Sequence, residues 1–178
     1  RELTDWGQLD ASNEGAVTVA KAVQHKYAST VLLLVTEVCA SYCRYCFRKR
    51  LFMHDNAEAI HDTTAIAEGI RYIRDNPQVN NVLLTGGDPT TLMTDQLEPI
   101  LKALRRIDHV KIVRIGTKTP AFNPYRFIDD QPFLEMLSRY SQPDRRIYFM
   151  CHFDHPNELT EASRQALHLI QQAGVICV

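Results

Sequence analysis

The chain has 178 residues, of which 45% are hydrophobic and 23% are charged. This length and composition predict one domain with a hydrophobic core and leave no room for two ordinary domains. Its 20 basic and 21 acidic residues give a net charge of −1, so the overall charge favours neither nucleic acid nor an anionic membrane surface. No apolar run approaches the roughly 20 residues that span a bilayer, which argues against membrane insertion.

The first 30 residues are polar and rich in small side chains, and glycines interrupt any helical period. We predict an irregular or weakly helical lead-in over residues 1–30. The N-terminus lacks the basic-then-apolar order of an export signal and also lacks an initiator methionine. We therefore expect a cytoplasmic protein, and we interpret the chain as a fragment of a longer one.

The rest of the chain, residues 31–178, alternates short apolar runs with helical patterns. Continuous apolar runs are typical of strands that are buried on both faces. Apolar residues that recur every three or four positions are typical of helices packed on a sheet. The predicted strands cover 31–35, 81–84, 110–115, 145–150 and 175–178, and the predicted helices cover 57–74, 94–106, 131–140 and 158–173.

This alternation predicts an α/β fold with a parallel sheet, either an open doubly wound sheet or a closing barrel. Polar or ligand-type residues follow the strands, at the edge where both architectures place their active sites. A barrel needs more strands than the five predicted, and the fifth strand coincides with the end of the chain. This observation favours the interpretation as a fragment.

Three of the five cysteines, Cys39, Cys43 and Cys46, follow the first predicted strand at spacings of four and three. Disulfide frameworks use an even and dense set of cysteines, and structural zinc sites usually have four ligands in two pairs. An iron–sulfur cluster held by three cysteines leaves one iron open to another ligand. We predict a cluster here, with zinc binding and metal-free thiols as alternatives. Four neighbouring cations are expected to lower the pKa values of these thiols: Arg44, Arg48, Lys49 and Arg50.

The second predicted strand ends in the turn Gly86-Gly87-Asp88-Pro89. Its glycines allow close backbone approach to a ligand, and Asp88 offers an acceptor for an ammonium group, although a tight strand-to-helix turn explains the same glycines. Beside a cluster with one open iron, the turn is a candidate for holding the amino group of a chelating ligand. His152 follows the fourth strand, where a histidine is more often structural than a ligand.

Several segments resemble known proteins. The CxxxCxxC spacing of the three cysteines resembles that of the radical S-adenosylmethionine (SAM) superfamily. The segments 43–50, 83–89, 112–120 and 152–160, in this order, resemble the lysine 2,3-aminomutase family. The resemblance covers roughly residues 25–178, and it implies a partial TIM-like barrel of parallel strands over residues 31–178, truncated after the fifth strand.

The resemblance also implies cofactors and their sites. Cys39, Cys43 and Cys46 would hold a [4Fe–4S] cluster whose free iron is chelated by S-adenosylmethionine, with the turn Gly86-Gly87-Asp88 holding the methionine end. Tyr45 and His152 are expected among the cofactor-binding residues. Cleavage of the sulfonium would give a 5′-deoxyadenosyl radical that abstracts a substrate hydrogen.

In the aminomutase family, pyridoxal phosphate carries the amino group between adjacent carbons. Arg48 matches the family arginine that binds the carboxylate of the amino-acid substrate. Lys26 and Tyr27 match a basic-Tyr-x-x-Arg pattern presented to pyridoxal phosphate, but Thr30 stands where an arginine is expected. The family's imine-forming lysine and the acidic residues that recognise a lysine substrate lie in its C-terminal part, which has no counterpart in this chain.

Three functions follow from these patterns. The first is an aminomutase-type radical SAM enzyme, reduced by a partner such as flavodoxin or ferredoxin. The second is an electron-transfer or cluster-carrier protein, in which Cys151 or Cys177 completes four-cysteine ligation; both are otherwise expected to be small core or rim residues. The third is a domain that keeps this fold but is catalytically inactive, because the closing strands and any imine-forming lysine are missing. A radical SAM enzyme that acts on a substrate other than lysine without pyridoxal phosphate is an alternative to the first.

Overall fold

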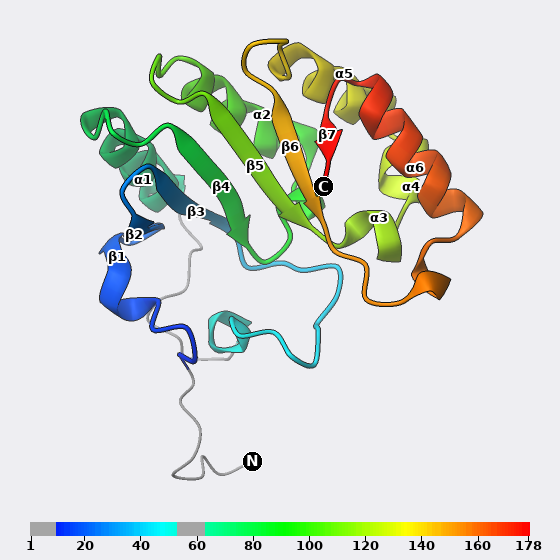
Figure 1. Ribbon diagram of the computed structural model, residues 1–178, viewed down its shortest axis with the longest axis horizontal. Helices are drawn as coiled ribbons and strands as arrows, with labels where there is room; N and C mark the ends of the chain where they lie inside the picture. The colour runs from blue at the N-terminus through cyan, green and yellow to red at the C-terminus, as the bar shows by residue number, and fades with distance from the viewer. Residues whose placement is uncertain (1–9, 53–62) are drawn as a thin grey trace, which may run out of the picture.

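A seven-stranded sheet forms the centre of the protein in the computed structural model, which describes residues 10–52 and 63–178 (Figure 1). Strands follow one another across the sheet in sequence order, from β1 at one edge to β7 at the other. Two N-terminal strands pair in antiparallel fashion, and the five that follow are parallel. The bounds are β1 (Thr18–Ala20), β2 (Val23–Tyr27), β3 (Thr30–Thr36), β4 (Asn81–Gly86), β5 (Ile112–Thr117), β6 (Ile147–Cys151) and β7 (Ile176–Cys177).

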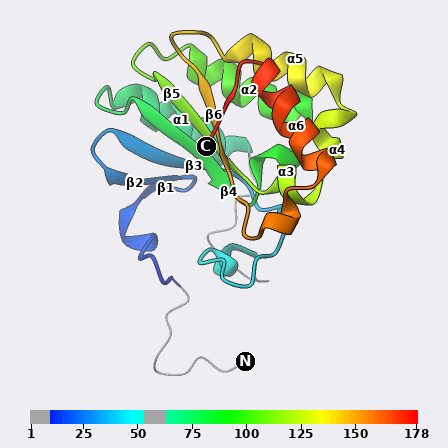
Figure 2. The same cartoon turned by 45° about the vertical axis from the view of Figure 1, so that its right-hand side comes forward.

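The helices lie on one face of this sheet, as the two views show (Figures 1 and 2). No described helix is long and apolar enough to cross a membrane. The α-helices are α1 (Thr63–Asp75), α2 (Thr94–Arg105), α3 (Thr119–Phe122), α4 (Tyr125–Ile128), α5 (Gln131–Tyr140) and α6 (Glu161–Gln172). Short 3-10 helices are η1 (Gly15–Val17), η2 (Lys49–Phe52), η3 (Pro89–Thr91) and η4 (Pro156–Glu158).

Side-chain alternation separates the covered face from the other face of the sheet. Register partners on parallel strands point to the same side, and successive residues point to opposite sides. The Leu33 side chain lies against Gly69 of α1, so its row faces the helices. That row continues through Leu84, Ile115, Phe149 and Cys177. We call the opposite side, which carries the row Leu32, Leu83, Arg114, Tyr148 and Ile176, the open face.

The core lies between the sheet and the helices. Leu33, Leu84, Ile115 and Phe149 are fully buried in it, and they meet apolar stripes on the helices. Phe149 packs edge-to-face on Phe127 of α4, with ring centroids 6.1 Å apart. Burial of such side chains stabilises the fold by about 1.5–3 kcal/mol each, so the covered face supplies most of the apolar driving force.

The structure confirms the predicted α/β fold, with five parallel strands consistent with a partial TIM-like barrel that does not close. The predicted strands and the last three predicted helices agree with the observed bounds to within three residues. The predicted helix start at residue 57 lies outside the described residues. The short helices α3 and α4 were not predicted, because four-residue helices beside Pro120 and Pro124 leave no periodic pattern.

The expectation of an irregular or weakly helical lead-in is wrong for residues 15–27. After the turn η1, this segment forms β1 and β2, and β2 pairs in antiparallel fashion with β3. The pairing satisfies backbone groups at the edge of β3, a tertiary effect that the polar composition of the segment does not reveal.

Candidate functional site

The cysteine loop leaves the C-terminal end of β3 and is pinned there by the neighbouring turn after β4. The backbone N–H of Gly87 donates to the carbonyl of Thr36 at 2.7 Å, and that of Asp88 donates to the carbonyl of Val38 at 2.9 Å. The hydroxyl of Thr36 accepts from the N–H of Val38 at 3.0 Å. These bonds fix the base of the loop before the first cysteine.

Two glycines allow this close approach. A Cβ on Gly87 would lie 2.2 Å from the carbonyl oxygen of Val38, and one on Gly86 would lie 2.4 Å from that of Thr36. Gly86 also has a φ of 114°, a backbone conformation that residues other than glycine rarely adopt. Contact with the base of the cysteine loop therefore accounts for both glycines.

The three loop thiols lie in one short segment and none is in a disulfide. Cys39 Sγ lies 3.1 Å and Cys43 Sγ 3.8 Å from the carbonyl oxygen of Ser41. The backbone N–H of Cys46 donates to the carbonyl of Cys43 at 3.0 Å. Among the described residues, no three metal-type side chains converge on a single ion position.

Burial raises the pKa of Cys39, although a hydrogen bond with the backbone of Ser41 opposes that shift. The expectation that nearby cations lower the pKa is therefore wrong for this thiol. Arg48 and Arg50 are instead paired with a carboxylate from the N-terminal segment, Glu14, which is only 5% exposed.

Arg48 lies on the open face, where its guanidinium has two partners. Nε and Nη2 each lie 2.9 Å from Glu14 Oε1, and Nη1 donates to the hydroxyl of Thr85 at 3.0 Å. Arg50 Nη1 lies 2.9 Å from Glu14 Oε2, an ion pair without hydrogen-bond alignment. Glu14 thus fixes the direction of Arg48, the expected substrate-binding arginine, beside the turn after β4.

The tip of the cysteine loop is tied to the loop after β6. Tyr45 donates its hydroxyl hydrogen to Asp154, and its oxygen lies 3.4 Å from His152 Nε2. His152 Nε2 lies 2.7 Å from Asp154 Oδ1. The structure therefore brings together Tyr45 and His152, two of the residues expected to bind cofactor.

A buried lysine supports this contact. Lys118 Nζ lies 2.5 Å from Asp154 Oδ2 and 2.9 Å from Glu158 Oε2. Burial would lower the pKa of Lys118, but hydrogen bonds to the two carboxylates outweigh it and raise the pKa. The Lys118 hydrogen bond, followed by that of Tyr45, lowers the pKa of Asp154 to about 2. Sequence reasoning missed Lys118, Asp154 and Glu158, although they lie within the aminomutase-like segments 112–120 and 152–160.

Asp88 has a different environment from the one expected. Asp88 is 2% exposed, and its carboxylate accepts hydrogen bonds from four other residues of the protein. Oδ1 accepts from the N–H and hydroxyl of Thr90, and Oδ2 accepts from the hydroxyl of Thr117, the N–H of Lys118, and the N–H and hydroxyl of Thr119. Asp88 therefore joins the loops after β4 and β5, and the oxygens expected to receive a ligand ammonium are already bonded.

Lys26 and Tyr27 lie at the opposite end of the sheet from the cysteines. Tyr27 pairs with Thr30 at the start of β3, and the cysteine loop begins after Thr36. Six residue steps along a strand span roughly 20 Å. The Lys26 ammonium lies 5.9 Å from the centre of the Tyr27 ring. The structure thus separates these two residues from the cysteine loop by the length of β3.

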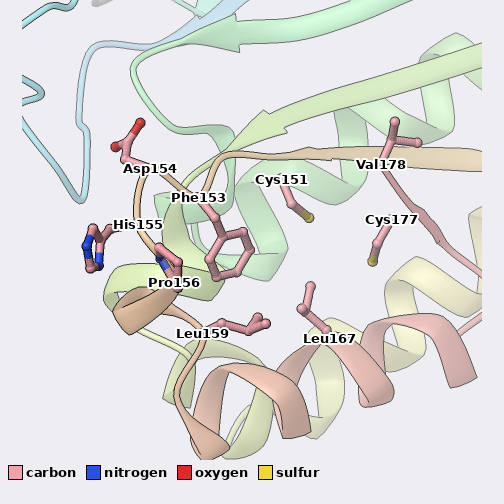
Figure 3. Close-up of a pocket in the computed structure, with 9 residues that line it drawn as sticks. All are labelled: Cys151, Phe153, Asp154, His155, Pro156, Leu159, Leu167, Cys177 and Val178. Carbon is pink, nitrogen blue, oxygen red and sulfur yellow. The ribbon is translucent and has the colours of Figure 1, made fainter.

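The remaining cysteines, Cys151 and Cys177, face a pocket on the helix side of the sheet (Figure 3). The pocket is about 420 Å³ and is otherwise lined mainly by apolar groups such as Phe153, Leu159 and Leu167. The neighbouring Cys177 side chain, followed by burial, raises the pKa of Cys151, and the Cys151 side chain lowers the pKa of Cys177. Both thiols thus line a pocket on the helix side of the sheet, the face away from Arg48.

Comparison with known proteins identifies the family of this chain. Residues 33–173 match the model of the radical SAM superfamily, and the chain belongs to that superfamily. An Aquifex aeolicus protein whose name includes L-lysine 2,3-aminomutase is 53% identical over 97% of this chain. L-lysine 2,3-aminomutase of Acetoanaerobium sticklandii is 38% identical over 94%, and glutamate 2,3-aminomutase of Clostridioides difficile is 39% identical over 98%. The chain spans 46%, 39% and 40% of the lengths of these relatives, respectively.

Proposed function

We propose that this chain carries the cluster-binding and SAM-binding part of an aminomutase-type radical SAM enzyme. The observation that carries the proposal is the arrangement of the cysteine loop, with its base held by the turn after β4 and its tip held by Asp154. Three thiols without disulfide partners project from a loop fixed at both ends. Such a loop suits a cluster that must meet a ligand in one orientation.

Cys39, Cys43 and Cys46 would hold a [4Fe–4S] cluster, and the backbone of Gly86 and Gly87 would lie beside the methionine end of S-adenosylmethionine. The cluster would supply the electron that cleaves the sulfonium to methionine and a 5′-deoxyadenosyl radical. The chain's own task is to orient the two groups and to exclude water. A reducing protein such as flavodoxin or ferredoxin would deliver the electron.

The proposed substrate is an amino acid, held through its carboxylate by Arg48 on the open face. A guanidinium matches a carboxylate in bidentate geometry, and Glu14 keeps this guanidinium in one orientation. The named relatives include aminomutases for lysine and for glutamate, whose side chains carry opposite charges. The proposed reaction is therefore a 1,2-amino migration, and the proposal does not specify the side chain of the amino-acid substrate. Pyridoxal phosphate is the proposed second cofactor, with Lys26 and Tyr27 on its phosphate side.

Anaerobic reconstitution tests the cluster. We expect about four irons per chain and a reduced-cluster EPR signal that changes when S-adenosylmethionine is added. Cys39→Ala, Cys43→Ala and Cys46→Ala should each lose the signal. A signal that S-adenosylmethionine leaves unchanged would overturn the enzyme proposal. Where S-adenosylmethionine does change the signal, formation of 5′-deoxyadenosine in the presence of dithionite would distinguish a domain that cleaves S-adenosylmethionine from one that only binds the cofactors.

An electron-transfer or cluster-carrier function makes a different prediction. It needs a fourth cysteine, but Cys151 and Cys177 line the pocket on the helix side of the sheet. Cys151→Ser and Cys177→Ser should therefore retain the iron content and the EPR signal of the unmodified chain. Loss of the cluster in either variant would favour the carrier function instead.

A further inference from the structure

One buried ammonium group lies behind the tip of the cysteine loop. The side chain of Lys118 is 6% exposed, and its Nζ lies 2.5 Å from Asp154 Oδ2 and 2.9 Å from Glu158 Oε2. A third contact joins Nζ to the carbonyl oxygen of His152, at 3.4 Å. An ammonium group has three N–H donors, so these contacts use all of them within the protein. Lys118 therefore acts on the loop after β6.

Both ends of Lys118 are held in place. Its backbone N–H donates to the buried carboxylate of Asp88 at 2.8 Å, and its ammonium group lies 5.1 Å from the centre of the Phe122 ring. Glu158 Oε2, which accepts from the ammonium group, also accepts from the backbone N–H of Asp154 at 2.9 Å. Supporting bonds of this kind fix the side chain that they meet. The carboxylate of Asp154 is thus held from the end of β5 as well as from its own loop.

Asp154 decides how two aromatic residues direct their polar atoms. The Lys118 hydrogen bond, followed by that of Tyr45, lowers the pKa of Asp154 to about 2, so at neutral pH its carboxylate is ionised and only accepts hydrogen bonds. Tyr45 donates its hydroxyl hydrogen to Asp154, and His152 Nε2 lies 2.7 Å from Asp154 Oδ1. The nitrogen that faces the carboxylate must carry a hydrogen, which leaves a lone pair on Nδ1 of the neutral ring.

We propose that Lys118 is a positioning residue that acts through Asp154. It holds His152 in the Nε2–H form, so that His152 Nδ1 and the Tyr45 oxygen face the ligand of the cysteine loop as hydrogen-bond acceptors. This inference rests on the proposed function, in which the ligand is S-adenosylmethionine, whose amino and hydroxyl groups are donors. Lys118 needs no contact with the ligand, because its charge and its position act on Asp154.

Nitrogen NMR of the chain without cofactors tests the form of His152. At about pH 8.5, where a histidine side chain is ordinarily neutral, its ring-nitrogen shifts should report the Nε2–H form. Asp154→Ala removes the acceptor and should give a mixture of the Nε2–H and Nδ1–H forms. His109, whose Nε2 meets the carbonyl oxygen of Ile73 at 3.0 Å, is the internal control and should have the same shifts in both proteins. An Nδ1–H form of His152 in the unmodified chain, or identical His152 shifts in Asp154→Ala, would overturn the proposal.

EPR titration of the reduced, reconstituted cluster with S-adenosylmethionine tests the role of Lys118. Lys118→Met should keep the iron content and the signal without S-adenosylmethionine, but should need about fivefold more S-adenosylmethionine to change that signal, the effect of one ordinary hydrogen bond. Lys118→Arg keeps the charge and the donors and should restore most of the affinity. Lys102→Met, at an exposed position on α2, is the matched control and should titrate like the unmodified chain. Asp154→Ala, at an exposed position, should weaken the affinity in the same way, so the test stands even if Lys118→Met fails to fold.

The possible results separate this inference from the proposed function. Equal affinities for S-adenosylmethionine in Lys118→Met and the unmodified chain would overturn the role of Lys118 and leave the proposed function intact. Loss of iron in Lys118→Met would also overturn it, because Lys118 would then support the cluster and not the ligand. An unmodified chain whose signal does not respond to S-adenosylmethionine would overturn the proposed function and, with it, the assignment of the ligand.

Discussion

Tyr45 in the cysteine loop donates a hydrogen bond to Asp154, which lies 109 positions later in the chain. The bond connects the loop after β3 to the loop after β6, so it crosses the ends of β4 and β5. Lys118, which follows β5, contacts the same carboxylate oxygen, with its Nζ 2.5 Å from Asp154 Oδ2. The cysteine loop is therefore positioned by three strands other than its own, β4 at its base and β5 and β6 at its tip.

Tyr45→Phe should loosen the tip of the cysteine loop without unfolding the protein. The variant removes one hydroxyl and keeps the ring that packs against His152 with centroids 5.8 Å apart. We expect amide hydrogen exchange in residues 39–47 to become about fivefold faster, the effect of one ordinary hydrogen bond. Tyr125→Phe, at an exposed position on α4, is the control and should leave this exchange unchanged. Equal exchange in the two variants would contradict a holding role for the hydroxyl.

The contact between Tyr45 and Asp154 should depend on pH at the acid end. The hydrogen bond from Lys118 is the main cause, and that from Tyr45 the next, of a pKa of about 2 for Asp154 in the folded protein. The pKa of an aspartate in the unfolded chain is about 3.9. Because the folded pKa is the lower one, the stabilisation is complete above about pH 4 and is lost as the pH falls toward 2. Carbon NMR of the Asp154 carboxyl group should show this low midpoint, and Lys118→Met should raise it. A midpoint that does not move in Lys118→Met would exclude Lys118 as the main cause.

Glu14→Gln should destabilise the protein by about 3 kcal/mol, because it removes the carboxylate that Arg48 and Arg50 share in a buried site, although Arg50 keeps its ion pair with Asp10 at 3.4 Å. Urea unfolding measures the change as a shift in midpoint at constant slope. Glu68→Gln, at an exposed position on α1, should shift the midpoint by less than about 0.5 kcal/mol. If both variants have the same urea midpoint, the pairing of Glu14 with Arg48 and Arg50 contributes little to the free energy of unfolding.

Asp88→Asn should be more damaging than its small change in shape suggests. The amide nitrogen of an asparagine would face donors that now point at a carboxylate oxygen, among them the N–H groups of Lys118 and Thr119. We expect a loss of at least about 3 kcal/mol, since buried donors left without acceptors cost about 1–3 kcal/mol each. Chemical unfolding of Asp88→Asn and of the exposed-site control Asp129→Asn gives the comparison. A loss below 1 kcal/mol in Asp88→Asn would mean that the loops after β4 and β5 keep their connection without this charge.

Local sequence patterns predicted what short segments determine by themselves. The apolar run 31–35 and the helical period of 131–140 each specify one element, and both were found close to their predicted bounds. The strand β2 was missed because Gln24, His25 and Lys26 interrupt its apolar pattern, and only pairing with β3 makes it a strand. The spacing of the cysteines was likewise visible because it lies within eight residues of one loop.

The long-range parts of the candidate site could not be predicted in this way. The partners of Asp88 in the β5 loop lie about 30 positions away, and Glu14 lies 34 positions from Arg48. A carboxylate in a polar segment gives no local sign that it will be buried against two arginines. Asp88 resembled a ligand-binding residue for this reason, although its oxygens are used within the protein.

Gly87→Ala should displace the base of the cysteine loop and weaken cluster binding together with stability. The new Cβ would lie 2.2 Å from the carbonyl oxygen of Val38, a backbone atom that cannot rotate away. We expect a loss of about 1–3 kcal/mol in urea unfolding, as for other overpacked sites, and a lower iron content after reconstitution. Gly116→Ala is the matched control, because its Cβ would meet no described atom closer than 3.9 Å, and it should retain the stability of the unmodified chain. Normal iron content in a destabilised Gly87→Ala protein would show that the turn after β4 stabilises the fold without positioning the cysteines.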